Sequence, residues 1–202
     1  MEEAKKYVTG EDAEEGKQVK NAEEALQGAK DIIAESISDS AEYRAYIRSA
    51  TMDEGVITSG AKDEKAESVY EMYYHFEEPV QKLAGHRILA LNRGEKEKFL
   101  TVKIEAPQED ILRYLEKKVI VRDNPQTNEV LRDVVRDAYD RLIAPAIERE
   151  IRSNLTERAE DGAIRVFGKN LEQLLMQPPI AGRVVLGLSL IHISEPTRHS
   201  LI

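Results

Sequence analysis

The stretch "LRDVVRDAYDRLIAPAIEREIRSNLTERAEDGAIRVFGKNLEQLL", residues 131–175, decides the fold class of this chain. Its apolar side chains recur at three- and four-residue steps, which is the spacing of one helix face. Pro145 lacks a backbone donor, so the helix is expected to kink or restart there. Gly162 and Gly168 each cost about 1 kcal/mol relative to Ala inside a helix, and we interpret them as positions of close helix packing. The apolar face is formed by Leu131, Val134, Val135, Ala138, Leu142, Ile147, Ile151, Leu155, Ala159, Ala163, Val166, Phe167, Leu171 and Leu174.

Two amphipathic helices are predicted before residue 55. Residues 22–37 place apolar side chains on one stripe, with acids near the start. Asp39 followed by Glu42 resembles a capping pair that opens a second helix, and Gly55 ends it. The short link between the two helices predicts an antiparallel pair.

Shorter helices are predicted further along the chain. Pro79 suits the first turn of a helix that ends at Gly85, and a second short helix is expected to end at Gly94. The segment "QEDILRYLEKKVI", residues 108–120, has helical spacing as well. Its inward-facing residues are expected to be Ile111, Leu112, Leu115 and Val119.

A few short strands complete the expected architecture. Residues 55–61 form one, and residues 99–105 form another, in which apolar and polar side chains alternate until Pro107. The apolar run "RVVLG", residues 183–187, is typical of a third strand. The sequence therefore predicts a mainly α fold: a multi-helix region with a few short β-strands.

Composition limits the classes of protein that remain. The 202 residues carry a formal net charge of −9, and no run of apolar residues approaches the roughly 20 needed to span a bilayer. The N-terminus lacks the apolar stretch of a secretory signal. Cysteine is absent, which excludes disulfides and thiolate metal sites. We therefore expect a cytoplasmic protein with no membrane partner and no surface that binds phosphate backbones everywhere.

The one basic stretch worth testing for nucleic-acid contact is "HRILALNRGEKEKF", residues 86–99. Its candidate phosphate-binding residues are Arg87, Arg93, Lys96 and Lys98. In the alternative interpretation, Arg87 pairs with a neighbouring acid and the lysines are ordinary surface residues, since Glu95 and Glu97 interleave them. The alternative is favoured by about two to one on charge pattern alone.

Residues for catalysis are few. The sequence contains no phosphate-binding loop, no His-Glu-x-x-His zinc motif, no nucleophile elbow and no calcium loop. We interpret His86 as a structural residue at a helix start and His75 as partly exposed packing. Three tyrosines could stack on bases, yet their spacing favours the core: Tyr70, Tyr73 and Tyr74. We expect no enzyme activity, no cofactor and no metal.

Four segments, in this order, resemble the N-terminal portion of the Tex family of bacterial RNA-binding transcription accessory proteins. They are "EEALQGAKDIIAE" at 23–35, "YEMYYHFEEPVQKLAGHRILALNRGEKEKFL" at 70–100, "LTERAEDGAIRVFGKNLEQLL" at 155–175 and "GRVVLG" at 182–187. The resemblance implies a helical N-terminal region over residues 1–181. It also implies that residues 182–187 begin a YqgF-type domain similar to RNase H, which helix-hairpin-helix elements and an RNA-binding OB-fold would follow.

The chain departs from this family after Gly187. The family continues with Leu-Asp-Pro-Gly, whereas Leu188 is followed here by Ser189, so the acid is absent and no family site residue is carried over. "LSLIHISEPTR", residues 188–198, resembles the translation of a sequencing-library adapter, and we expect residues 188–202 to be non-native. The family also has helical sequence ahead of the position of Met1, which we therefore expect to be an internal methionine.

The resemblance and the residues together leave three interpretations of function. The first is a fragment of an RNA-binding transcription accessory protein that acts as a helical scaffold, with RNA or DNA and the transcription machinery as partners of the complete protein. The second is part of a nuclease-like enzyme whose catalytic domain lies elsewhere. The third is a helical protein-interaction module with no nucleic-acid role.

Overall fold

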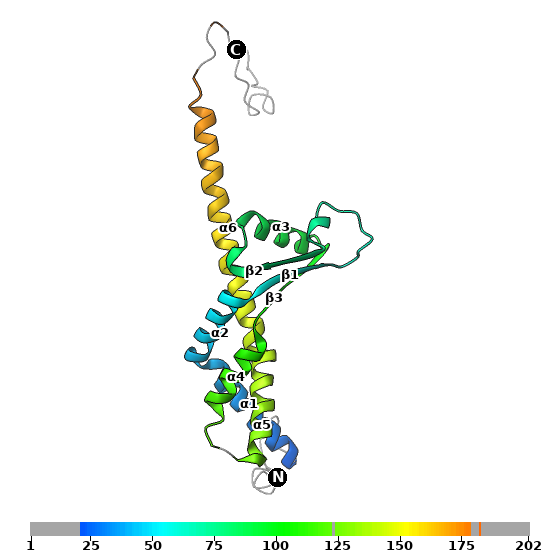
Figure 1. The fold of residues 1–202 in the computed structure, drawn as a ribbon, viewed down its shortest axis with the longest axis vertical. Coiled ribbons are helices and arrows are strands. Elements are labelled where there is room, and N and C mark those ends of the chain that lie inside the picture. Colours follow the sequence, from blue (N-terminus) through cyan, green and yellow to red (C-terminus); the bar gives the residue numbers. More distant parts are fainter. Residues whose placement is uncertain (1–20, 123, 179–181, 183–202) are drawn as a thin grey trace, which may run out of the picture. The chain divides into compact units, whose positions relative to one another are not determined.

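The structure of the protein, a computed structural model, describes residues 21–122, 124–178 and 182 (Figure 1). The chain divides into two compact units, residues 1–164 and residues 165–202. The elements are α1 (Ala22–Asp39), α2 (Ala41–Glu54), β1 (Val56–Ala61), η2 (Glu71–Tyr73), β2 (His75–Pro79), η3 (Val80–Lys82), α3 (Gly85–Lys96), β3 (Leu100–Glu105), α4 (Gln108–Val119), α5 (Pro125–Asp137), η4 (Ala138–Ile143) and α6 (Ala144–Leu175). This order confirms the predicted fold class, mainly α with a few short strands.

Most helices of the first unit share one apolar core. It is built by α1, α2, α4, α5, η4 and the first part of α6, together with Val80 of η3 and Ile88 of α3. The predicted inward face of α4 is confirmed, since Ile111, Leu112 and Leu115 are all buried. Other fully buried members are Ile47, Val135, Ile143, Ile147 and Ile151. Residues that are far apart in the sequence therefore pack against one another in this core.

A single residue links α1 to α2. The Ser40 backbone N–H donates to the carbonyl of Ile37 at 3.3 Å, and its hydroxyl accepts from the Tyr43 N–H at 3.5 Å. Ser40 therefore caps the end of α1 and the start of α2 at once. The expected capping by Asp39 is wrong by one residue, because Asp39 is still the last residue of α1.

The three strands form an antiparallel sheet in the order β2-β1-β3. The predicted alternation in β3 is confirmed, since Leu100 and Val102 are buried while Thr101 and Lys103 are exposed. One face of the sheet shares a second apolar cluster with α3 and η2: Ile57, Tyr70, Tyr73, Tyr74, Leu91, Leu100 and Val102. β2 was not predicted, and the helix expected after Pro79 is only the short η3.

Gly94 does not end α3, contrary to expectation. The helix continues to Lys96, and Gly94 is buried inside it. A Cβ atom at this position would lie 2.6 Å from Leu100 Cδ1 and 3.2 Å from Tyr70 Cδ1. The glycine is needed because the strand and the tyrosine approach the helix backbone closely.

The helical tract continues through Pro145 instead of restarting there, and the adjustment lies before the proline. η4 is a wide helical turn, in which the Ala144 N–H donates to the Tyr139 carbonyl five residues earlier. Pro145 follows in the first turn of α6, where a missing N–H leaves little unsatisfied. The helical tract therefore passes through the proline without a break in its buried face, from Ile143 to Ile147.

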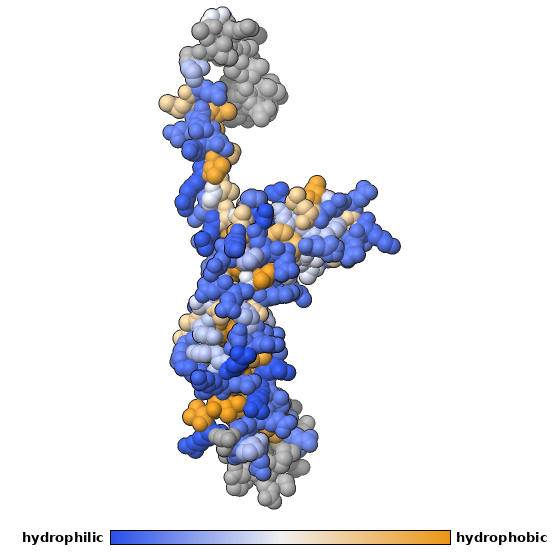
Figure 2. Space-filling model, viewed as in Figure 1, coloured by the Kyte–Doolittle hydropathy of each residue, from blue (hydrophilic) through white to orange (hydrophobic). Residues whose placement is uncertain are grey.

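In the second unit, the described part of α6 is exposed. Phe167 is 68% exposed and Leu174 is 67% exposed, and Figure 2 shows apolar residues on the surface of this segment. The close packing expected at Gly162 and Gly168 is wrong for the described residues, because nothing there lies within 4 Å of a Cβ at either position. Of the predicted domain start at 182–187 only Gly182 is described, and the tail 188–202 lies outside the described residues.

Candidate nucleic-acid interface

Three of the four predicted phosphate-binding residues lie on α3, and the fourth lies two residues after its end. Arg87, Arg93 and Lys96 belong to the helix. Lys98 sits in the turn before β3 and has a φ of 67°, the left-handed region that closes a helix end. The turn is held by backbone bonds from Lys98 N–H to Glu95 O at 3.0 Å and from Phe99 N–H to Gly94 O at 2.9 Å.

The Arg87 guanidinium is already paired within the protein. It lies 2.7 Å from the Glu78 carboxylate on β2 and 5.9 Å from the centre of the Phe76 ring. Both contacts hold α3 against β2. The alternative in which Arg87 pairs with a neighbouring acid is therefore confirmed for this residue, and Arg87 does not lie with the other cations.

Arg93, Lys96 and Lys98 are exposed, and none of them forms an ion pair with an acid among the described residues. Burial raises the pKa of the nearby Tyr70 phenol and a hydrogen bond to Glu97 raises it further, while Arg93 opposes the shift. Glu97, which lies in the same segment, therefore interacts with the Tyr70 phenol. We call Arg93, Lys96 and Lys98 the α3 cation cluster.

Glu95 belongs to a different network. Its carboxylate accepts a short hydrogen bond from Arg152 of α6, and Arg152 also donates to the Val102 carbonyl and the Asn92 side-chain oxygen, each at 3.4 Å. Burial raises the pKa of the Glu95 carboxyl, but the Arg152 guanidinium outweighs it and holds the pKa below its usual range. The sequence suggested that Glu95 weakens the positive field at Lys96, whereas its charge is neutralised by Arg152.

Sequence reasoning missed Lys62 as a neighbour of this cluster. Its backbone N–H donates to the Phe99 carbonyl at 2.9 Å, which brings the residue after β1 beside the α3 turn. Only the strand register could have shown this, since Lys62 lies 36 positions before Lys98. Asp63 and Glu64 follow it, so the added positive charge is local.

The remaining candidate residues have ordinary structural positions. Tyr70, Tyr73 and Tyr74 are buried, which confirms the interpretation as core residues. His75 and His86 are exposed. Within the part of the chain that the structure describes, no three His, Asp or Glu side chains gather closely enough to hold a metal ion, and no helix is long and apolar enough to cross a bilayer.

Comparison with known proteins tests the resemblance of this sequence to the Tex family. The family model described as "Tex central region-like" matches residues 1–167. The chain belongs to the Tex central region-like family. All members of the helical core lie within the matched residues.

Relatives of this Tex-like chain cover most of its length. It is 50% identical over 177 residues to an uncharacterised protein of Bacillus subtilis (strain 168) named YdcI, covering 86% of this chain and 25% of that protein. It is 31% identical over 185 residues to protein Tex of Bordetella pertussis, covering 84% of this chain and 23% of that protein. Human S1 RNA-binding domain-containing protein 1 is 30% identical over 175 residues, covering 80% of this chain and 18% of that protein. The chain thus spans a quarter or less of each of these relatives.

Proposed function

We propose that the chain is the helical scaffold of an RNA-binding transcription accessory protein, and that the α3 cation cluster is its contact with nucleic acid. Family membership supports the accessory role, since a relative from Neisseria gonorrhoeae is named transcriptional accessory protein Tex. RNA as the ligand is supported by the name of the human relative, which carries an S1 RNA-binding domain. The scaffold works without catalysing a reaction, and transcription places it in the bacterial cytoplasm.

The observation that carries the proposal is the division of the cations into two groups. The guanidiniums of Arg87 and Arg152 join α3 to β2 and to α6, each through a carboxylate within the unit. Exposed cations that are free of ion pairs among the described residues can instead approach phosphates and release their counterions. Arg93, Lys96 and Lys98 meet this condition on one short segment.

The test is binding of a single-stranded RNA 20-mer to the full chain over a series of salt concentrations. In the variant R93A/K96A/K98A, three phosphate contacts are lost. The slope of log K against log salt should therefore shrink by about 2. The matched control is K82A/K117A/R136A, which removes the same charge from exposed positions elsewhere in the first unit.

Two outcomes would contradict parts of the proposal. If both triple variants weaken binding equally, the contact is diffuse and the α3 cation cluster is not the site. If the wild-type chain binds no RNA even at low salt, the chain contributes no RNA contact of its own, and the protein-interaction interpretation replaces the one proposed. Replacing Arg87 should leave the salt slope unchanged, because its charge already faces Glu78.

A further inference from the structure

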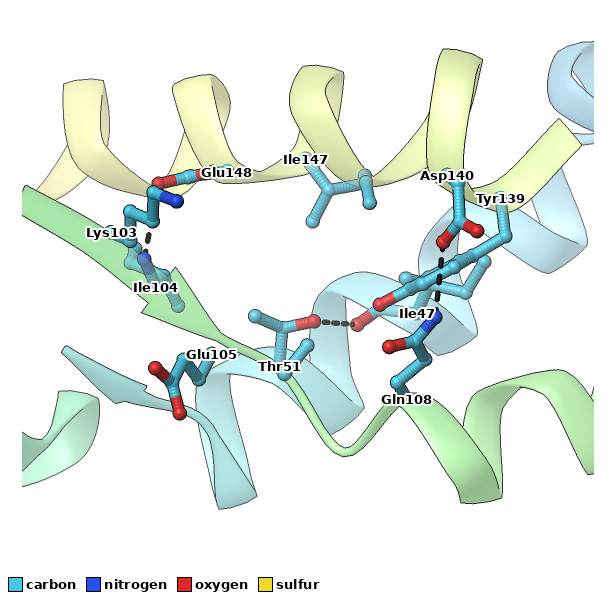
Figure 3. A pocket seen from close by; sticks show the side chains of 12 residues that line it. Ile47, Thr51, Lys103, Ile104, Glu105, Gln108, Tyr139, Asp140, Ile147 and Glu148 are labelled. Atoms are coloured by element: carbon cyan, nitrogen blue, oxygen red, sulfur yellow. Dashed lines mark hydrogen bonds between the residues drawn. The ribbon is translucent and has the colours of Figure 1, made fainter. Parts of the chain in front are cut away.

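A cavity of about 550 Å³ lies in the first unit, where α2, the end of β3, the start of α4 and the junction of η4 with α6 meet (Figure 3). Its volume is in the range of small-molecule sites, roughly 300–1,000 Å³. Asp140 and Glu148 line its two ends, and Ile147 projects between them from the same helical tract. At the α-helical rise per residue, the backbone positions of these two residues are roughly 12 Å apart along the axis.

Each of these carboxylates is held in place by one of its oxygens. Asp140 Oδ1 accepts from Gln108 Nε2 at 3.0 Å, and Glu148 Oε1 accepts from the backbone N–H of Ile104 at 3.0 Å. The second oxygen of each carboxylate makes no hydrogen bond to a described residue. Two positioned acceptors therefore lie at opposite ends of a cavity with an apolar wall between them.

Tyr139 gives an independent indication that the cavity takes a ligand. The side chain is 4% exposed and lines the cavity, yet its hydroxyl has no hydrogen-bond partner among the described residues. The hydroxyl therefore keeps its hydrogen-bonding capacity for a molecule that enters the cavity. Burial raises the pKa of this phenol and the Asp140 carboxylate adds to the shift, so the group is a neutral hydroxyl that can donate or accept.

The charge of the lining residues indicates which kind of ligand the cavity can bind. Three carboxylates line the cavity, those of Glu105, Asp140 and Glu148, against the single ammonium of Lys103, which leaves a formal balance of −2. A ligand that fits has positive charge at both ends and an aliphatic middle that can lie on Ile147. We propose that this cavity binds a linear aliphatic polyamine of the spermidine class.

Lys103 sets the strength of this binding. Figure 3 shows its side chain at the Glu148 end of the cavity, where it competes with one cationic end of the ligand. The opposite end, formed by Asp140 and Tyr139, has no such competitor among the lining residues. The two ends therefore respond to substitution in opposite directions.

The experiment is calorimetric titration of the full chain with spermidine. Asp140→Asn keeps an acceptor for Gln108 and removes the charge, so it should weaken binding about tenfold. Tyr139→Phe should weaken binding about threefold and leave the thermal midpoint unchanged, because its hydroxyl has no protein partner to lose. Lys103→Met should tighten binding about threefold. The short 1,3-diaminopropane cannot reach both ends and should bind about tenfold more weakly than spermidine.

An acidic chain attracts polyamines everywhere, so Asp133→Asn on α5 is the matched control. It makes the same charge change at an exposed position outside the cavity. Equal weakening by Asp133→Asn and Asp140→Asn would overturn the proposal in favour of diffuse attraction. So would weaker binding by Lys103→Met, or a lowered thermal midpoint in Tyr139→Phe without any effect on spermidine, which would mean that the hydroxyl holds only a water.

Discussion

The two parts of α6 carry the same apolar spacing and differ in what covers it. In the first unit, Ile147 and Ile151 are each 1% exposed and pack in the helical core. In the second unit, Phe167 and Leu174 are about two-thirds exposed. The spacing of a helix determines which side chains share a face, whereas burial depends on partners supplied by other parts of the chain, such as Ile47 and Ile111.

The largest effect expected from this difference is on stability. Ile151→Ala should lower the free energy of unfolding by about 2–5 kcal/mol, because it leaves a cavity in a closed core. Leu171→Ala removes an exposed side chain and should change it by less than about 0.5 kcal/mol. Urea unfolding of both variants, compared at constant m-value, measures the difference. A loss of similar size in both variants would mean that the second part of α6 is also covered in solution.

A smaller effect on stability should distinguish Gly94 from Gly168. Gly94→Ala should cost about 1–3 kcal/mol, since its Cβ would meet Leu100, which is fully buried and cannot move aside freely. Gly168→Ala should instead stabilise the chain by about 0.5–1 kcal/mol, because the space around it is open among the described residues. Thermal unfolding monitored by circular dichroism distinguishes the two signs. If Gly168→Ala destabilised the chain instead, this result would support the close helix packing at Gly168 that the sequence suggested.

Periodicity predicted the helices well and their ends less well. Residues 22–37 and 108–120 match α1 and α4 closely, because a strong apolar stripe acts locally. β2 was missed because "HFEEP", residues 75–79, has little apolar character and becomes a strand only by pairing with β1. Gly94 was taken for a helix end because nothing local shows that Leu100 lies against it.

The sequence indicated which cations of the candidate interface are exposed, but it did not show which acids are bound by other residues. Charge density singled out Arg93, Lys96 and Lys98 correctly as exposed residues. It could not show that Glu95 is bound by Arg152, which lies 57 positions away in the sequence. The tertiary contact removes the acid that made this stretch look balanced, and it strengthens the case for testing the α3 cation cluster.

The smallest predicted effect concerns the polar side chains of the two parts of α6. Arg152 lowers the pKa of Glu95, so this pair stabilises the fold above the unfolded pKa of about 4.3 and loses its contribution as the pH falls through the lower folded pKa. Glu95→Gln should cost about 1 kcal/mol at pH 7, and the difference from wild type should disappear in acid. Glu172→Gln, on the exposed second part, is the matched control and should change the free energy of unfolding at pH 7 by less than about 0.5 kcal/mol. Urea unfolding over a series of pH values from 7 downward checks this. A difference between Glu95→Gln and wild type that stays constant over the whole series would mean that the loss comes from packing, because the charge pair stops contributing once Glu95 is protonated.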